Sequence, residues 1–329
     1  MENVKARIAV ALTAVLSATA AWAAPTTAGP AIRTSVWVNV AVATLWTSPT
    51  APRPVDAKAT SAPVDIRGWL AAMSTSTRRG LVGRVETQAL YGDRLVVTGV
   101  KPGWLHVAVP TQPSHRDSRG YPGWVPERQV TPTAPESTAS IATVTSLTSW
   151  LRSASGTKVV EVSFGTRLPV LASTSSAVTV ATPTHHRLVV PARDVIRGSP
   201  GAAALPRTAT SVLASARTFL GKPYLWGGRS GFAVDCSGFT SLVFAVHGVV
   251  VPRDADDQAT AGQAASLNAL RPADLLFFRS GGTVDHVGFF LGSGRMLHAP
   301  HTGTVVQVGD MGQPASARRV FSANAAHSG

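Results

Sequence analysis

The stretch that decides the fold of the C-terminal part of this chain is VDCSGFTSLVFAVHG, residues 234–248. Its apolar residues return at a spacing near 3.6, which predicts a helix, and Gly248 is a typical residue for a helix end. Cys236, the only cysteine in 329 residues, stands in the first turn of this helix. The free N–H groups and the dipole of that turn favour a thiolate, which predicts a nucleophile; the alternative is a small buried core residue.

The residues on either side of this helix predict an α+β domain. An upstream helix is expected over residues 210–221, because its apolar residues have the same spacing and Gly221 and Pro223 end it. Four short apolar runs follow, joined by Gly-containing turns, and predict an antiparallel sheet: DLLFFRS, HVGFFLG, RMLHAP and TVVQVGD. His286 begins one expected strand and His298 lies on the next, so an imidazole is available as a base for the thiol.

Three stretches with the composition of linkers, 24–34, 131–140 and 198–206, divide the rest of the chain. The segments 35–131 and 140–198 are related by an internal repeat, in which three motifs return in the same order. The pairs are GDRLVV (92–97) with GTRLPV (165–170), WLHVAVP (104–110) with AVTVATP (177–183), and WVPERQV (124–130) with VVPARDV (189–195). An eight-residue deletion after the second motif of the second copy accounts for the change in spacing. Short alternating apolar runs broken by Gly and Pro predict a small all-β barrel for each copy.

The N-terminus has the pattern of a secretory signal peptide over residues 1–23: a basic start, a short apolar run and Ala21-Trp22-Ala23. We therefore expect a secreted protein without a membrane span after cleavage; an uncleaved N-terminal anchor is the alternative. The formal net charge of +13 comes from scattered basic residues rather than from long basic runs. For an exported protein this favours anionic cell-wall polymers over nucleic acid as partners.

Five motifs within residues 205–329 resemble, in order and spacing, those of the NlpC/p60 family of cysteine peptidases: GKPYLWGG (221–228), DCSGF (235–239), DLLFF (274–278), DHVGFFLG (285–292) and MLHAP (296–300). The resemblance implies a papain-like catalytic domain in which Cys236 is the nucleophile. It implies His286 as general base, His298 as the residue that orients it, and Tyr224 as a donor to the oxyanion beside the Cys236 N–H. No cofactor and no metal centre are expected, since the sequence has no metal-binding motif.

The third catalytic position has an alternative. If Ser293-Gly294 formed a tight two-residue turn, the strand register would place His301 opposite His286 and would turn His298 to the other face of the sheet. A bulge or a longer loop would remove this conflict. The family spacing of twelve residues between the two histidines favours His298.

The N-terminal copies resemble bacterial SH3-like domains through Gly92, Gly103-Trp104 and Gly123-Trp124; the second copy lacks both tryptophans and resembles a degenerate domain. ETQALYGD (86–93) and GYPGWVP (120–126) resemble a subgroup of NlpC/p60 peptidases with two such domains. That resemblance implies cleavage of the γ-D-glutamyl–diaminopimelate (or L-Lys) bond in peptidoglycan stem peptides with a free N-terminal L-alanine.

The same resemblance implies a set of substrate-binding residues. Glu86 and Tyr121 would hold the alanine ammonium together with Asp235, because carboxylates are the natural partners of a buried cation. The other residues of the expected cleft are Trp226 and Ser237 in the lining of this pocket and Arg253 and Asp254 at its edge.

Two other functions are consistent with the sequence. One is a non-catalytic wall-binding protein built from SH3-like modules, and the other is an amidase or acyltransferase that uses the same nucleophile on another wall amide. A cleft closed by the first SH3-like domain would favour free stem peptides, whereas an open cleft would admit the intact cross-linked wall. The diamino acid at the scissile bond and the oligomeric state are left open by the sequence.

Overall fold

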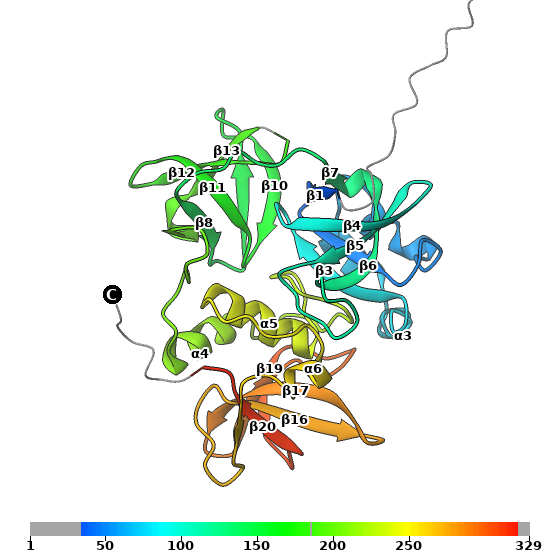
Figure 1. Ribbon diagram of the computed structural model, residues 1–329, viewed down its shortest axis with the longest axis vertical. Helices are drawn as coiled ribbons and strands as arrows, with labels where there is room; N and C mark the ends of the chain where they lie inside the picture. The colour runs from blue at the N-terminus through cyan, green and yellow to red at the C-terminus, as the bar shows by residue number, and fades with distance from the viewer. Residues whose placement is uncertain (1–33, 185, 322–329) are drawn as a thin grey trace, which may run out of the picture.

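The computed structural model describes residues 34–184 and 186–321, so the predicted signal peptide at residues 1–23 lies outside the described residues. The described chain forms three units that meet around helix α5 (Cys236–Val246) (Figure 1). Two all-β units lie on one side of this helix, and a six-stranded sheet lies on the other side.

The first unit is an antiparallel seven-stranded sheet curled into a small barrel. Its strand order is β3-β2-β6-β5-β4-β1-β7. In β4, Leu95 and Val97 are completely buried whereas Arg94 is exposed, the alternation expected of a strand with one face on a core. The strands are β1 (Ser35–Val38), β2 (Val42–Trp46), β3 (Val85–Leu90), β4 (Arg94–Lys101), β5 (Trp104–Val109), β6 (Tyr121–Pro126) and β7 (Val130–Thr131), with the 3-10 turn η2 (Glu127–Gln129) before β7.

The second unit repeats this fold strand for strand. Its order, β10-β9-β13-β12-β11-β8-β14, matches that of the first barrel position by position, which confirms the predicted internal repeat. The second copy therefore has all seven strands, although it lacks both tryptophans. The elements are β8 (Ile141–Val144), β9 (Thr148–Arg152), β10 (Lys158–Ser163), β11 (Arg167–Ser173), β12 (Ala177–Ala181), β13 (Arg187–Pro191), η3 (Ala192–Asp194) and β14 (Val195–Gly198).

A helical insertion between β2 and β3 was not expected from the sequence. It contains η1 (Pro54–Asp56), α1 (Ala57–Thr60), α2 (Ile66–Ala72) and α3 (Thr75–Arg79). Asp65 caps α2 and Ser74 caps α3, each by accepting a hydrogen bond from a backbone N–H in the first turn. Trp69 is completely buried, and its indole N–H donates to Asp56 at 2.8 Å. The insertion thus packs on a hydrophobic core that it shares with the third unit.

The third unit is the predicted α+β domain. Helix α5 begins at Cys236 as predicted, and Gly248, with φ of +68°, stands just beyond its end. The sheet has the order β15-β20-β16-β17-β18-β19, in which β16 to β19 form the expected antiparallel meander. The remaining elements are α4 (Ala209–Arg217), α6 (Ala255–Gln258), β15 (Gln263–Ala265), β16 (Leu275–Ser280), β17 (Thr283–Gly292), β18 (Arg295–His298), β19 (Gln307–Asp310) and β20 (Ser316–Arg319).

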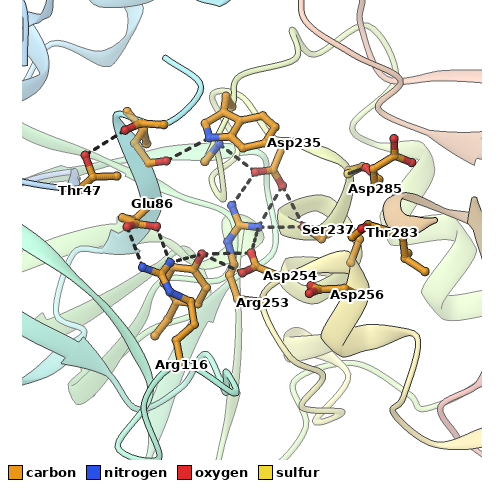
Figure 2. A pocket seen from close by; sticks show the side chains of 18 of the residues that line it. Thr47, Glu86, Arg116, Asp235, Ser237, Arg253, Asp254, Asp256, Thr283 and Asp285 are labelled. Carbon is orange, nitrogen blue, oxygen red and sulfur yellow. Dashed lines mark hydrogen bonds and ion pairs between the residues drawn. The ribbon is translucent and has the colours of Figure 1, made fainter. Parts of the chain in front are cut away.

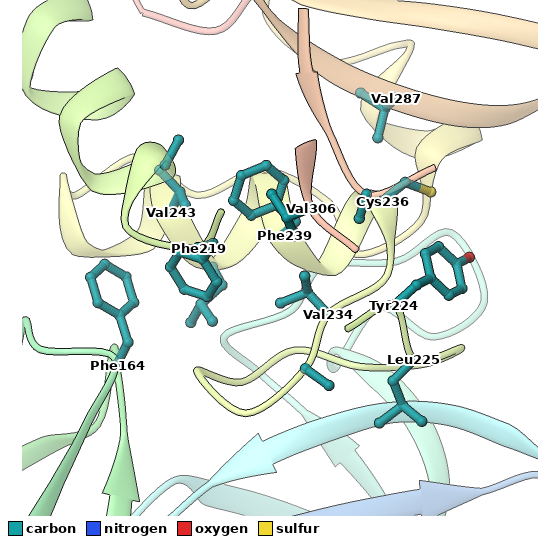
Figure 3. Close-up of a cluster of buried hydrophobic side chains, with 14 of the residues drawn as sticks. Phe164, Phe219, Tyr224, Leu225, Val234, Cys236, Phe239, Val243, Val287 and Val306 are labelled. Atoms are coloured by element: carbon teal, nitrogen blue, oxygen red, sulfur yellow. The ribbon is translucent and has the colours of Figure 1, made fainter. Parts of the chain in front are cut away.

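Helix α5 is packed from two sides, which fixes the position of its first turn (Figure 3). Toward the sheet, Phe239 and Phe244 pack on Phe289 of β17 with ring centroids 5.4 and 5.3 Å apart. Toward the second barrel, Phe219 lies between Phe239 and Phe164, at 5.5 and 5.2 Å. Such aromatic contacts each contribute roughly 0.5–1.5 kcal/mol beyond the area that they bury.

No helix in the described part of the chain is long and apolar enough to cross a membrane.

Candidate active site

Cys236 is the first residue of α5, and its side chain is almost completely buried. Asp235 caps the helix by accepting a hydrogen bond from the backbone N–H of Gly238 at 2.6 Å. The sulfur lies 4.0 Å from the carbonyl oxygen of Asp285 in β17. The sheet therefore approaches the thiol at the strand that also carries His286.

The protonation state of this thiol differs from the sequence-based expectation. Burial, and after it the negative charge of Asp235, raise the pKa of Cys236 to about 12. Hydrogen bonds from the backbone of Val287 and Ser237 lower the pKa but do not offset burial. Burial at this helix N-terminus therefore favours the neutral thiol over the expected thiolate.

The two predicted imidazoles contact each other. Nε2 of His286 lies 2.8 Å from Nδ1 of His298. Because this contact uses Nε2, the nitrogen of His286 that is left for the thiol proton is Nδ1. Burial, and after it the charge of neighbouring histidines, lower the pKa of both histidines to about 4. Both rings are neutral near pH 7, the state in which His286 can accept a proton.

The register of β17 against β18 explains why His298 is the partner. The two-residue turn at residues 293–294 is present, as the His301 alternative requires, but the register shifts just before Gly292. This β-bulge returns His298 to the face of the sheet that carries His286. The structure thus brings His298 to His286 and leaves His301 in the loop after β18.

Tyr224 lies on the loop before α5 and lines the same pocket as Cys236. Its backbone N–H donates to the carbonyl oxygen of Thr304 at 3.0 Å, which holds the loop in place. Burial and the neighbouring thiol of Cys236 raise the pKa of Tyr224 well above its usual range, so the hydroxyl keeps its proton. In the described part of the chain this hydroxyl has no hydrogen-bond partner, and it is available to donate to an oxyanion.

Arg253 connects the first barrel to the helix turn that carries the nucleophile. Sequence analysis predicts it at the edge of the cleft, whereas the structure buries it to 1% exposure. Its terminal nitrogens donate to the Asp235 carboxylate at 2.7 and 3.1 Å and to Ser237 at 2.9 Å. Its Nε donates to Thr87 of β3 at 2.8 Å. Asp235 also accepts from the backbone N–H of Gly227 at 2.9 Å, so its acceptor positions are occupied.

A pocket of about 400 Å³ opens beside Cys236, between the first barrel and the third unit (Figure 2). The first barrel contributes Thr47, Gly83, Val85, Glu86, Arg116 and Tyr121. The third unit contributes Tyr224, Trp226, Gly227, Asp235, Cys236, Ser237, Arg253, Asp254, Ala255, Asp256, Thr283, Val284 and Asp285. All seven predicted substrate-binding residues line this pocket; the two imidazoles do not. Its five carboxylates outnumber its two guanidinium groups in a chain of net charge +13, so the pocket favours a cation.

The end of the pocket at the first barrel holds an ion pair that the sequence did not indicate. The terminal nitrogens of Arg116 donate to the two carboxylate oxygens of Glu86 at 2.6 and 2.9 Å. Nη1 of Arg116 also lies 3.1 Å from the hydroxyl of Tyr121, which donates to Asp254 at 2.9 Å. The structure brings Glu86, Tyr121 and Asp235 to one pocket as expected. Both carboxylates, however, already form an ion pair: Glu86 with Arg116 and Asp235 with Arg253.

Trp226 lies on the wall of the pocket between Cys236 and the first barrel. Its indole N–H donates to the carbonyl oxygen of Val85 in β3 at 3.1 Å, and 37% of the residue is exposed. A tryptophan held in this way offers a rigid apolar surface to a peptide.

The described residues contain one group whose side chains could hold a metal ion: His115, Asp256 and Asp257, of which Asp256 lines the pocket. His115 already contacts Asp257, with Nδ1 2.8 Å from the carboxylate. The group is largely exposed and does not include the nucleophile.

Two residues of the site, Arg116 and Thr87, were not predicted from the sequence. Arg116 lies in the loop after Pro110 whose extra length in the first copy the sequence does show. Thr87 carried no signal, because a threonine in a strand is ordinary and its bond to Arg253 joins residues far apart in the chain.

Comparisons with known proteins agree with this geometry. The model of the NlpC/P60 family matches residues 221–325, and that of the YkfC SH3b2 domain matches residues 144–196. A γ-D-glutamyl-L-lysine dipeptidyl-peptidase of Bacillus subtilis is 39% identical over 274 residues, which cover 82% of this chain and 90% of that protein. A protein of the same name from Bacillus cereus is 34% identical over 84% of this chain and 86% of its own length.

A solved structure resembles the whole described chain. An NlpC/P60 family protein from Bacillus cereus superposes with a TM-score of 0.82 at 32% sequence identity, over 87% of this chain and 99% of that one. The relatives and this structure span both barrels as well as the catalytic unit. Together with the thiol, the paired imidazoles and the pocket, they show that the chain belongs to the NlpC/P60 family of cysteine peptidases.

Proposed function

We propose that this peptidase hydrolyses the γ-D-glutamyl–L-diamino acid bond of peptidoglycan stem peptides, and that it selects peptides with a free N-terminal L-alanine. The observation that carries the proposal is the acidic pocket, which begins at Cys236 and ends at the first barrel. A dipeptide with a terminal ammonium has the charge that such a pocket favours. The names of the two Bacillus relatives support the bond and the dipeptide product.

The first half of the reaction forms a thioester. Nδ1 of His286 takes the proton of Cys236 while the sulfur attacks the γ-carbonyl carbon of D-glutamate, and the electron pair of the C=O bond moves to oxygen. The hydroxyl of Tyr224 and the backbone N–H of Cys236 stabilise that oxyanion. Because the resting groups are a neutral thiol and a neutral imidazole, the proton moves during the attack.

The second half releases both products. The tetrahedral intermediate collapses, the C–N bond breaks, and His286 gives its proton to the amine of the departing diamino acid. His286 then takes a proton from a water molecule, whose oxygen attacks the thioester carbon. The C–S bond breaks, the sulfur recovers the proton from His286, and L-Ala-D-Glu leaves with a free γ-carboxylate. Throughout, His298 positions the ring of His286 through the 2.8 Å contact.

The position of the first barrel supports free stem peptides over the intact wall. Glu86, Arg116 and Tyr121 line the end of the pocket at the first barrel, where Arg116 is paired with Glu86. A peptide still attached to a glycan would have an amide in place of the ammonium and would need space beyond this end. We also propose that the enzyme acts outside the cytoplasm, on the support of the N-terminal signal pattern.

The test uses L-Ala-γ-D-Glu-L-Lys, its diaminopimelate analogue, and N-acetylated forms of both, with mass spectrometry of the products. We expect cleavage after D-glutamate, a rate for the acetylated peptides lower by about 100-fold or more, and no turnover by C236A. Cleavage at another bond, or turnover by C236A, would refute the assignment. Equal rates with and without the acetyl group would refute the selection of a free amine. For the location, N-terminal sequencing of the extracytoplasmic fraction is expected to begin at residue 24; an intact N-terminus in the cytoplasm would contradict export.

A further inference from the structure

The pocket has two ends, and the reaction assigns one part of the substrate to each. The acyl part, L-Ala-γ-D-Glu, runs from the sulfur of Cys236 toward the first barrel in the proposed function. The leaving diamino acid must lie where His286 can give a proton to its α-amine, because the C–N bond breaks with that transfer. His286 belongs to β17, so this strand borders the leaving diamino acid.

Asp285 stands at this leaving-group end. It directly precedes His286 in β17, its backbone carbonyl oxygen lies 4.0 Å from the sulfur of Cys236, and the residue lines the pocket. Figure 2 shows Asp285 and Thr283 at one end of the pocket and Glu86 at the other. Asp285 is exposed, and no cationic side chain of the described residues forms an ion pair with it.

The cations that line the pocket do not balance this charge. They are the guanidinium groups of Arg116 and Arg253, and each already forms an ion pair with another carboxylate. Arg279, on the neighbouring strand β16, does not line the pocket, and its Nη1 lies 3.5 Å from the carbonyl oxygen of Gly282. The leaving-group end therefore presents a carboxylate that a substrate cation can approach.

A second carboxylate of the pocket, Asp256, is placed differently. It lies on α6, and its ligand atoms stand within 4.8 Å of those of His115 and Asp257. An imidazole of the first barrel is thus already beside Asp256. Asp285 has no such neighbour and adjoins the general base, so it is the carboxylate that the leaving diamino acid meets.

The two diamino acids of stem peptides differ in charge at the end of their side chains. The side chain of L-lysine ends in a single ammonium, with a charge of +1. The side chain of meso-diaminopimelate ends in an ammonium and a carboxylate on one carbon, with a net charge of zero. A carboxylate without a nearby cation attracts the first and repels the carboxylate of the second.

We propose that Asp285 is a specificity residue for the leaving diamino acid: it binds the side-chain ammonium of L-lysine and makes the enzyme prefer L-lysine to meso-diaminopimelate at the scissile bond. This assignment rests on the proposed function. The preference is modest, because Asp285 is exposed and water and salt screen the pair.

The experiment measures kcat/KM for L-Ala-γ-D-Glu-L-Lys, its Nε-acetyl-lysine form and its meso-diaminopimelate analogue at low ionic strength. We expect the wild-type enzyme to prefer the lysine peptide to each of the others by about 5-fold, and the preference to shrink at high salt. Asp285→Asn is expected to bring both ratios to about 1, and Asp285→Lys to invert them. Each ratio is taken within one variant, so a change in His286 that affects all three peptides equally cancels.

Asp310→Asn is the matched control. Asp310 is an exposed aspartate on β19 of the same sheet that does not line the pocket, and its loss is expected to leave both ratios unchanged. Equal kcat/KM for the three peptides in the wild type, or wild-type ratios in both Asp285 variants, would overturn the assignment. Loss of the preference in Asp256→Asn but not in Asp285→Asn would also overturn it. Failure to cut any of the three peptides after D-glutamate would instead refute the proposed function.

Discussion

The two barrels share one fold and differ in what they do for the active site. Both have seven strands in the same order, yet all the barrel residues that line the described pocket come from the first. The second barrel packs on the far side of α5, where Phe164 contacts Phe219 and Ser163 accepts from the backbone N–H of Gly231 at 2.8 Å. The repeated fold is a scaffold, and residues on its strands β3 and β6 together with the connections between strands give the first copy its part in the pocket.

The difference lies in two connections. Between β2 and β3 the first barrel carries four short helical segments, whereas residues 153–157 join β9 to β10 in the second. Between Pro110 and Pro126 the chain advances sixteen positions, against eight between Pro183 and Pro191. The longer loop reaches the catalytic unit: the carbonyl oxygen of Pro113 accepts from the backbone N–H of Arg253 at 2.9 Å.

The largest effect is expected when the loop between β5 and β6 of the first barrel is replaced by the corresponding loop of the second barrel. Residues 110–120 are replaced by TPTHH, the sequence that joins β12 to β13. We expect kcat/KM for the free-amine peptide to fall by about 100-fold, because the contacts of this loop with Arg253, Glu86 and Asp257 are lost. Circular dichroism and thermal unfolding check that the barrel still folds. A loss below about 3-fold would mean that the loop is not part of the site.

The second barrel is expected to contribute stability instead. Phe164→Ala removes a completely buried ring and lowers the free energy of unfolding by about 3 kcal/mol, measured in urea. KM for the free-amine peptide stays within about 2-fold of wild type, since no residue of this barrel lines the described pocket. Val159→Ala, in an exposed position of the same barrel, is the control and changes neither quantity. A large rise in KM for Phe164→Ala would contradict this division of roles.

Neither barrel is expected to set the pKa of the general base. Burial in the catalytic unit lowers the pKa of His286 to about 4, and the imidazole is neutral above that pH. As pH falls below 4 the ring is protonated, and kcat/KM drops by about 10-fold per pH unit. The midpoint is read from pH–rate profiles corrected for unfolding. The loop-replaced variant keeps the same midpoint, and a shift of more than one pH unit would show that the first barrel tunes the base.

A smaller effect is expected where the first barrel supports Arg253. Thr87→Val removes the acceptor for Nε of Arg253 and leaves that buried donor unpaired. We expect kcat/KM to fall by about 5-fold, because Asp235 and the first turn of α5 are held less firmly. Thr179→Val, at a half-buried position on β12 of the second barrel, is the control for the same change of residue type and leaves kcat/KM unchanged. Equal values of kcat/KM for the two variants would show that Thr87 does not support catalysis.

The smallest effect is expected at the contact between His115 and Asp257. The hydrogen bond and charge of Asp257 raise the pKa of His115, so the protonated ring in the first barrel holds the catalytic unit. This stabilisation is complete at pH values below the ordinary histidine pKa and is lost as pH rises through the raised value. We expect KM to rise by about 2-fold across that range, and His115→Gln to abolish the rise. A wild-type KM that is independent of pH would show that the contact between His115 and Asp257 does not affect substrate binding.

Sequence patterns predicted the elements whose signals are local. The helix at Cys236, the meander of β16 to β19 and the barrel repeat each follow from apolar spacing, glycine stops and repeated motifs within a few residues. Sequence patterns did not predict the helical insertion between β2 and β3, because its helices are at most seven residues long and depend on the burial of Trp69 for their stability. A bulge of one residue before Gly292 decided between His298 and His301, and such a bulge has no sequence signal here.

The sequence by itself determined the residue types of this enzyme: one thiol, two imidazoles and the motifs around them that identify the family. Only the tertiary structure decided how these groups are charged and paired. The thiol keeps its proton because it is buried, and two of the expected ammonium ligands already hold arginines. The physical reason is that desolvation and ion pairing depend on residues far apart in the chain, such as Thr87 and Arg253, which meet only after the first barrel packs against the catalytic unit.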